Sequence, residues 1–201
     1  MKALGRGSIA SVVRVGLQVT WVLLWVAAGA LVLGAFGYGL LLWLVNTGAV
    51  DATILSGRGG HIRMGDDGST FHLTYDNPAG ITWPVAVPAF LIGAVAITGA
   101  LIIVWRLRKL FDSFSSGEPF RRENAQHLRV IWITMLGIEL ARYALLALTG
   151  LLLVNFGHPH MDANYQINID LSTWGAILIL IVLAEVFREG ARLKEEQELT
   201  I

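Results

Sequence analysis

The chain has 201 residues, of which 55% are hydrophobic and 15% charged, and it contains no cysteine. Ordinary soluble domains carry about 25% charged residues, so the composition argues against that class. A formal net charge of zero gives no sign of a nucleic-acid or acidic partner, and the lack of cysteine excludes disulfides and thiol chemistry. The composition predicts a protein whose main solvent is lipid.

Four apolar segments have about the length needed to cross a hydrocarbon core about 30 Å thick, which takes roughly 20 helical residues. They are residues 15–45, 83–104, 130–154 and 171–187. The first is too long to span upright, and it is too long for a cleaved secretory signal, which favours a retained signal anchor. Including their polar extensions, we predict helices over about 15–45, 83–114, 119–154 and 171–196, in one membrane domain that spans residues 1–201.

Lysine and arginine are unevenly distributed around these segments. Of the 15 in the chain, most lie before the first helix, in the 106–129 loop or after the last helix, whereas the other two loops hold only Arg58 and Arg63. Cytoplasmic flanks of membrane helices retain positive charge. We therefore expect a multi-pass protein of the bacterial cytoplasmic (inner) membrane, with both termini and the 106–129 loop in the cytoplasm and with 46–82 and 155–170 as extracytoplasmic loops.

The two outer loops contain alternating apolar and polar residues, which indicate strands. In the first loop, residues 61–64 and 70–75 flank the turn-forming Gly65-Asp66-Asp67-Gly68, which predicts a β-hairpin. In the second loop, residues 165–171 alternate in the same way and predict a third strand of a small sheet. The predicted fold class is an all-α membrane protein: a four-transmembrane-helix bundle with a small extracytoplasmic β-hairpin or sheet and a cytoplasmic helical hairpin.

The cytoplasmic hairpin, residues 106–129, is predicted from an apolar stripe that continues the second helix. The stripe is formed by Leu107, Leu110, Phe111 and Phe114, at i, i+3, i+4 and i+7. Pro119 suits the beginning of the next helix. The aromatic surface with its basic rim favours either anchoring to lipid headgroups with contacts inside the protein, or a partner site. Candidate partner-binding residues are Phe111, Phe114, Gly117, Pro119, Phe120, Asn124, Glu196, Leu199 and Ile201.

Two groups of residues carry a resemblance to a known family. The first is Leu110-Phe111, Gly117-Glu118-Pro119-Phe120, Glu123-Asn124 and Leu128-Arg129, and the second is Phe187, Gly190, Leu193 and the closing Glu195-Glu196-Gln197-Glu198-Leu199-Thr200-Ile201. With the four-helix layout, they resemble the bacterial membrane proteins of domain of unknown function 2975. The resemblance spans most of the chain, although the outer loops match only in general character. It implies no assigned activity and a frequent association with a small helix-turn-helix transcription regulator.

Two further groups of residues suggest chemistry. Glu139 and Arg142 lie three residues apart within an apolar segment, where they are expected to form an intramembrane ion pair or, as the alternative, part of an ion or proton pathway. Imidazole groups in the outer loops suit zinc or copper, although their spacing matches no established site. These histidines are His61, His72, His158 and His160.

No HExxH, P-loop or GxSxG sequence occurs, so we expect neither an enzyme nor a cofactor. The favoured function is that of a regulatory or scaffolding component, which binds membrane lipid and a cytoplasmic protein such as a helix-turn-helix regulator, without direct binding of nucleic acid. The alternative is an outward-facing sensor or transporter-like protein for a metal or small ligand. The sequence leaves open whether the chain forms a homo-oligomer.

Overall fold

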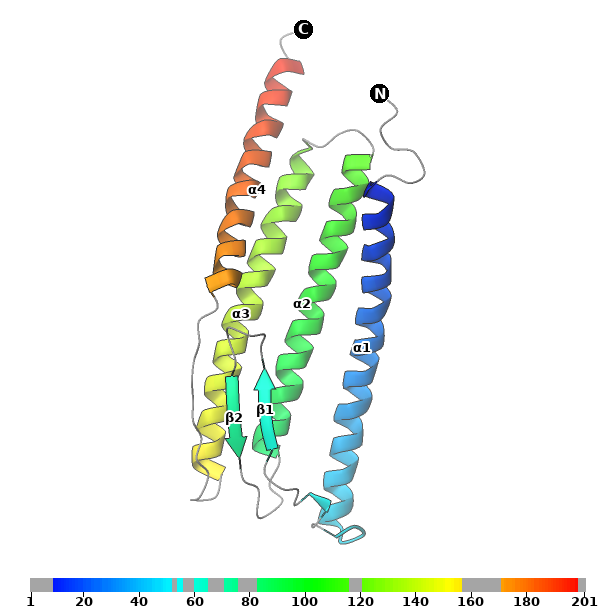
Figure 1. The fold of residues 1–201 in the computed structure, drawn as a ribbon, viewed down its shortest axis with the longest axis vertical. Coiled ribbons are helices and arrows are strands. Elements are labelled where there is room, and N and C mark those ends of the chain that lie inside the picture. Colours follow the sequence, from blue (N-terminus) through cyan, green and yellow to red (C-terminus); the bar gives the residue numbers. More distant parts are fainter. Residues whose placement is uncertain are drawn as a thin grey trace. The chain divides into compact units, whose positions relative to one another are not determined.

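The computed structural model describes residues 9–51, 54–55, 60–64, 71–75, 83–115, 121–156 and 171–198. In these ranges the chain forms four helices and two short strands (Figure 1). They are α1 (Ile9–Asn46), β1 (Gly60–Met64), β2 (Phe71–Tyr75), α2 (Trp83–Ser115), α3 (Arg122–Phe156) and α4 (Leu171–Glu198). α1 begins earlier than the predicted start near residue 15, and α3 begins later than the predicted start near residue 119.

All four helices are long and apolar enough to cross a membrane. Even α4, with 28 residues, would be about 42 Å long at 1.5 Å per residue, more than the hydrocarbon thickness of about 30 Å. Along α1, large apolar side chains such as Leu33 and Phe36 remain exposed in the isolated chain. Lipid can cover such side chains without cost, whereas water cannot. The protein is therefore a multi-pass membrane protein.

α1 ends in a local backbone arrangement that its sequence explains. Gly48 has a φ of 74°, in the left-handed region that glycine adopts readily. The amide of Gly48 donates to the carbonyl of Val45 at 3.1 Å, and the amide of Ala49 donates to that of Leu44 at 3.1 Å. These two hydrogen bonds satisfy carbonyls that the helix end would otherwise leave unpaired. The chain can therefore turn away from α1 directly after the apolar segment.

The chain divides into two compact units. Unit 1 comprises Met1–Ala28, Ala96–Glu139 and Ser172–Ile201, and unit 2 comprises Gly29–Val95 and Leu140–Leu171. The basic residues on which the predicted orientation depends lie in unit 1. Unit 1 therefore contains the surface that the sequence predicts to be cytoplasmic.

In unit 2, α1 and α2 pack closely through small and aromatic residues. A Cβ atom added at Gly93 would lie 2.6 Å from Cδ1 of Leu31, so the end of the leucine side chain would have to move to make room for it. Nearby, the rings of Tyr38 and Phe90 tilt against each other with centroids 5.9 Å apart. Close approach at small residues is the usual way in which membrane helices associate, because apolar burial gives little advantage inside a bilayer.

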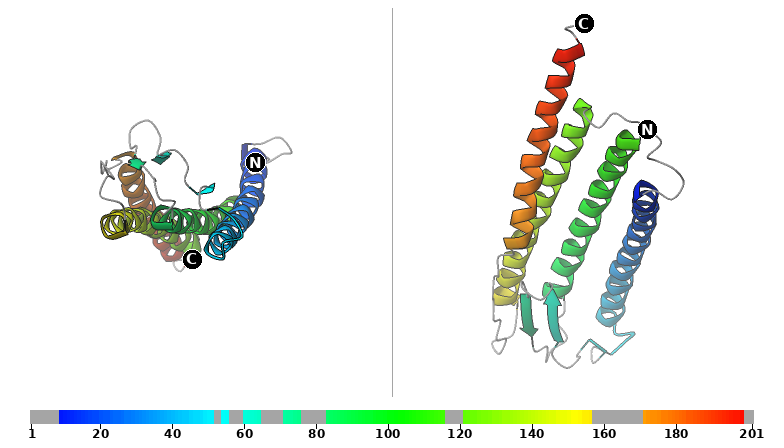
Figure 2. Two further views of the ribbon diagram at one scale, coloured as in Figure 1. Left: turned by 90° about the horizontal axis from the view of Figure 1, so that it is seen from below. Right: turned by 45° about the horizontal axis from the view of Figure 1, so that its top comes forward.

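In unit 1, the beginning of α1 lies beside the end of α2, as Figures 1 and 2 show. α2 and α3 also approach closely, at Gly99, where an added Cβ atom would lie 2.6 Å from Cγ1 of Ile138. α4 packs against both α2 and α3 through the apolar core described below. Unit 1 thus brings together four helix segments that are distant in the sequence.

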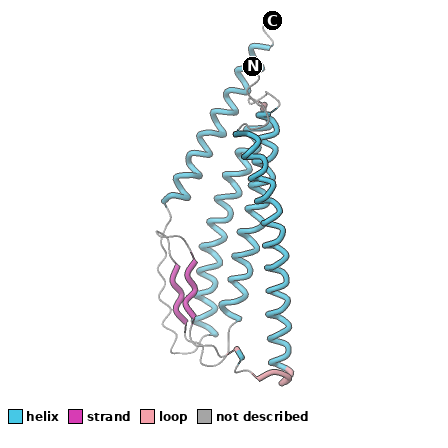
Figure 3. Tube along the Cα trace, turned by 45° about the vertical axis from the view of Figure 1, so that its right-hand side comes forward, coloured by secondary structure: helices cyan, strands magenta, loops and turns pink. Residues whose placement is uncertain are grey.

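β1 and β2 pair antiparallel, with Gly60 opposite Tyr75 and Met64 opposite Phe71 (Figure 3). This ladder contains two strands. Leu171, predicted to end a third strand, instead begins α4, and the rest of that predicted strand lies outside the described residues.

The predicted extracytoplasmic sheet is therefore wrong as a component of the fold class. Two five-residue strands do not form an independently stable sheet, and the fold is that of four long helices. The reason for the error at Leu171 is physical: a chain entering a bilayer must satisfy its own backbone groups, which a helix does and a lone strand does not.

Candidate functional site

The end of α2, the beginning of α3 and the middle of α4 pack around a small apolar core in unit 1. Its buried members are Leu110 of α2, Leu128 of α3 and Ala184 of α4. Partly buried side chains surround them: Leu107, Phe114, Trp132, Leu180 and Phe187. The apolar stripe recognised in the sequence of α2 is thus largely the face that packs against the other two helices.

Phe111 and Phe114, two of the candidate partner-binding residues, are half-buried. The two rings meet edge to face with centroids 6.1 Å apart, and Phe114 stacks on Phe187 of α4 at 5.9 Å. Aromatic pairs in such geometry add about 0.5–1.5 kcal/mol to the free energy of packing. Phe114 therefore helps to hold α2 to α4, while Phe111 stands at the end of this row of rings.

Asn124, another candidate partner-binding residue, has only 1% of its surface exposed. Its side-chain Nδ2 donates a hydrogen bond of 2.8 Å to Oγ of Ser113 in α2, and its backbone amide donates to the carbonyl of Arg121. A buried amide needs such partners, because an unpaired polar group in an apolar setting is costly. Asn124 ties the beginning of α3 to the end of α2 and presents almost no surface to a partner.

Aromatic and imidazole groups engage the basic residues at the end of α2. Arg106 Nη1 lies 3.2 Å from Nδ1 of His127 in α3, and since a guanidinium only donates, the imidazole nitrogen accepts. The guanidinium of Arg106 and the Nζ atom of Lys109 lie 4.6 Å and 4.1 Å from the centroid of the Trp105 ring. Cation–π contacts of this kind hold the charges close to the helix surface.

α1 contributes a further pair of contacts to this end of unit 1. Arg14 Nη2 lies 2.6 Å from Oδ1 of Asp112, and the guanidinium of Arg108 lies 5.7 Å from the centroid of the Trp21 ring. Both side chains of the ion pair are more than half exposed, so the pair contributes about 0–1 kcal/mol. These contacts locate the beginning of α1 without stabilising it strongly.

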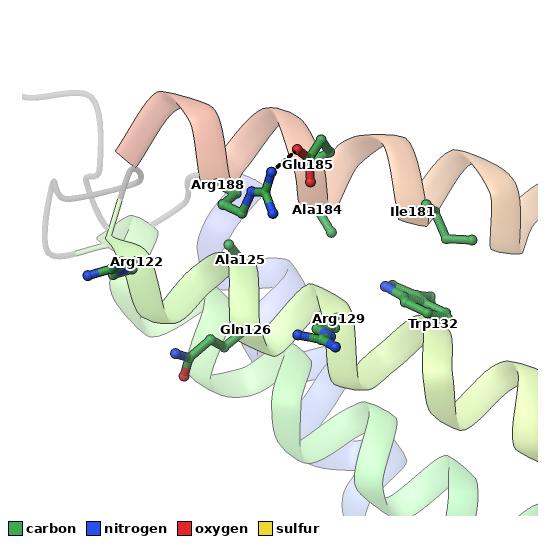
Figure 4. Close-up of a pocket in the computed structure, with 9 residues that line it drawn as sticks. All are labelled: Arg122, Ala125, Gln126, Arg129, Trp132, Ile181, Ala184, Glu185 and Arg188. Carbon is green, nitrogen blue, oxygen red and sulfur yellow. Dashed lines mark hydrogen bonds and ion pairs between the residues drawn. The ribbon is translucent and has the colours of Figure 1, made fainter. Parts of the chain in front are cut away.

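A cavity of about 450 Å³ lies between α3 and α4 in unit 1 (Figure 4). Its volume is within the range of ligand sites, about 300–1,000 Å³. Three guanidinium groups and one carboxylate line it, together with apolar side chains. The lining residues are Arg122, Ala125, Gln126, Arg129, Trp132, Ile181, Ala184, Glu185 and Arg188.

A second cavity, of about 280 Å³, shares Arg122 and Arg188 with the first and is otherwise lined by α4. Its other lining residues are Glu189, Ala191, Arg192 and Glu195. Sequence reasoning did not identify either cavity. In the sequence Arg129 is a flanking charge and part of the family resemblance, and Arg188 is a flanking charge. No signal in one helix indicates which side chains of another helix will face it.

Of the remaining candidate partner-binding residues, the structure describes one. Glu196 is exposed on α4 and lies 3.5 Å from Nε of Arg192. Five others lie outside the described residues: Gly117, Pro119, Phe120, Leu199 and Ile201. Partner binding by any of these residues stays a prediction.

Glu139, a member of the predicted intramembrane pair, is 5% exposed on α3. The guanidinium of Arg142 lies 5.2 Å from the centroid of the neighbouring Tyr143 ring. Burial of a carboxylate within an apolar helix is costly enough to need a partner. The Glu139–Arg142 pair stays a prediction.

Of the four histidines considered as metal ligands, two lie on the described strands. In the β ladder His61 is opposite Thr74 and His72 is opposite Arg63, so the two histidine positions are diagonal to one another. His158 and His160 lie outside the described residues. Within the ranges that the structure describes, no three His, Asp or Glu side chains form a group that could hold a metal ion, and metal binding stays a prediction.

Comparison with known proteins gives a family and no function. No curated protein and no solved structure matches the chain. The family model described as "Protein of unknown function (DUF2975)" matches residues 71–201, which include β2, α2, α3 and α4. This match confirms the resemblance seen in the sequence and covers more than half of the chain. The protein therefore belongs to the DUF2975 family of proteins of unknown function.

Proposed function

We propose that this protein is a regulatory or scaffolding component of the cytoplasmic membrane, which binds a cytoplasmic protein on the polar extension of α4, residues 188–198, beside the beginning of α3. Both termini lie in the cytoplasm in this proposal, as the distribution of basic residues favours. The chain acts by holding its partner at the membrane and needs no catalysis of its own. A small helix-turn-helix regulator is the candidate partner.

The observation that carries the proposal is the length and rigidity of α4 beyond its apolar segment. Residues 188–198 continue the helix for roughly 16 Å. Ion pairs brace this extension: Arg188 pairs with Glu185, and Arg192 pairs with Glu189 at 2.6 Å and Glu196 at 3.5 Å. Each pair is worth only about 0.3–0.5 kcal/mol. Together they favour a helix that is formed before binding, which lowers the entropy cost of association.

The extension has one face that packs and one that is open. Ala191 is buried, whereas Leu193, which projects about 160° away from it around the helix axis, is 51% exposed. Glu196 and Gln197 follow Leu193 at i+3 and i+4 and are also exposed. An apolar side chain between polar neighbours on a preformed helix suits recognition by a groove on a partner.

Charge on this extension supports the choice of partner class. Glu195, Glu196 and Glu198 make the end of α4 acidic. DNA-binding proteins carry basic surfaces that neutralise phosphates. An acidic helix can occupy such a surface, so that binding at the membrane would compete with binding to DNA.

Affinity purification from membranes, with the full chain as bait, tests the proposal. Leu193→Ala combined with Glu196→Ala should reduce recovery of the soluble partner, since both changes fall on the open face. Lys194→Ala, about 100° away around the helix, is the matched control and should retain the partner. If the inserted double variant recovers every soluble protein that the wild type recovers, the α4 extension is not the binding surface.

A further inference from the structure

We propose that the cavity between α3 and α4 binds the headgroup of an anionic phospholipid. The phosphate would lie between Arg129 and Arg188, and an acyl chain would run along Trp132 and Ile181 (Figure 4). This site is separate from the open face of α4 proposed for a protein partner.

The cavity lies where two helices pass from apolar to polar sequence. Arg129 is the last basic residue before the apolar segment of α3, and Arg188 is the first after the apolar segment of α4. Both therefore mark the same boundary between hydrocarbon and headgroups. Trp132, one turn into the apolar side, is a residue type that favours this interface.

Charge in the cavity is complementary to an anionic headgroup. Arg122, Arg129 and Arg188 line the cavity, and its one carboxylate, that of Glu185, is paired with Arg188. In the part of the chain that the structure describes, neither Arg122 nor Arg129 has an ion-pair partner. Guanidinium groups bind phosphate through paired hydrogen bonds. Basic pockets between membrane helices on the cytoplasmic side are a known setting for acidic lipids.

Small side chains create the space that a lipid would fill. Ala125 of α3 and Ala184 of α4, both buried, point toward one another across the floor of the cavity in Figure 4. Ile181 and Trp132 continue the wall on the apolar side. A free phosphate would use the arginines alone, whereas a phospholipid would use the arginines and this apolar wall. The combination favours a lipid as the occupant.

Native mass spectrometry of the detergent-solubilised full chain tests the site, with phosphatidylglycerol and phosphatidylcholine as the two probes. Both lipids carry an anionic phosphate, but phosphatidylcholine also carries a positively charged choline, which the arginines repel. We therefore expect a preference of about tenfold for phosphatidylglycerol. Arg129→Gln with Arg188→Gln should abolish the preference. Arg121→Gln with Lys194→Gln removes the same charge outside the cavity and should preserve it.

Three outcomes would overturn the assignment. Equal binding of the two lipids would refute a headgroup-specific site. An equal loss of the preference in the control variant would show that overall positive charge, and not this cavity, attracts the lipid. Displacement of phosphatidylglycerol by an equal concentration of glycerol phosphate would indicate a site for soluble phosphate. Because the glutamine variants could be destabilised, a photoactivatable phosphatidylglycerol is also applied to the wild type. Adducts should map to residues 122–132 and 181–188, and adducts confined to other helices would refute the site.

Discussion

Substitution of Gly99 tests the packing of α2 against α3. An added Cβ atom would lie 2.6 Å from Ile138 Cγ1, whereas carbon atoms in contact lie about 3.5–4.0 Å apart. Gly99→Ala therefore needs a movement of about 1 Å. Ile138 is β-branched and has essentially one helical rotamer, so the helices must separate. Overpacking lowers the free energy of unfolding by about 1–3 kcal/mol. The higher helix propensity of alanine offsets about 1 kcal/mol of this loss. We expect a net loss of up to about 2 kcal/mol in the free energy of unfolding.

Thermal unfolding in detergent, followed by circular dichroism, measures this loss. Gly137→Ala in α3 is the matched control, because no atom lies within 4 Å of the Cβ it would add; it should be neutral or stabilising. Ile138→Ala removes the clashing atoms, so the pair of substitutions should show favourable coupling in a double-mutant cycle. The close approach is refuted if Gly99→Ala is as stable as Gly137→Ala, or if the cycle shows no coupling.

Three other predictions address topology and buried polar groups. Alkaline phosphatase fused after residue 60 should be active and after residue 118 inactive; the opposite result would reverse the predicted orientation. Asn124→Ala should lower the free energy of unfolding by about 1–3 kcal/mol by removing the hydrogen bond from Asn124 to Ser113, while Gln126→Ala on the exposed side should change it by less than about 0.5 kcal/mol. Equal effects in thermal melts would show that Asn124 does not hold α3 to α2. If Glu139 and Arg142 form the predicted intramembrane pair, Arg142→Leu should destabilise more than the same change combined with Glu139→Leu, because the single change removes the partner of a buried carboxylate. Equal or milder damage from the single change would indicate that water reaches the site and would favour a transport function.

Most of the helices could be predicted from the sequence, because a membrane-spanning helix must meet a simple requirement of length and composition. A bilayer requires long apolar segments with internally paired backbones, and the composition of residues 83–104 or 130–154 satisfies this directly. The end of the predicted third strand was wrong for a different reason. Alternation in 165–171 is short, and Leu171 belongs to the apolar run that follows it, so the helical pattern of α4 overrides the strand pattern.

The sequence analysis predicted several residues of the candidate site but not the direction in which their side chains point. Phe114 and Asn124 were noticed as an aromatic and a polar residue near a helix end, and either could face a partner or the chain. The structure places Phe114 against Phe187 and Asn124 against Ser113. Such pairings join residues on different helices, and the pattern within a single helix contains no information about them. The cavity between α3 and α4 could not be predicted from the sequence for the same reason.

The two proposed sites meet at Arg188, which lines the cavity and also begins the α4 extension. A phosphate bound there would compete with Glu185 for the guanidinium, and the present ion pair, more than half exposed, offers little resistance to that exchange. The pairs of Arg192 with Glu189 and Glu196 would stay intact, so the extension can remain helical with lipid bound. Leu193 lies on the face opposite Ala191 and outside both cavities. A lipid and a protein can therefore occupy α4 together, and loss of one need not entail loss of the other.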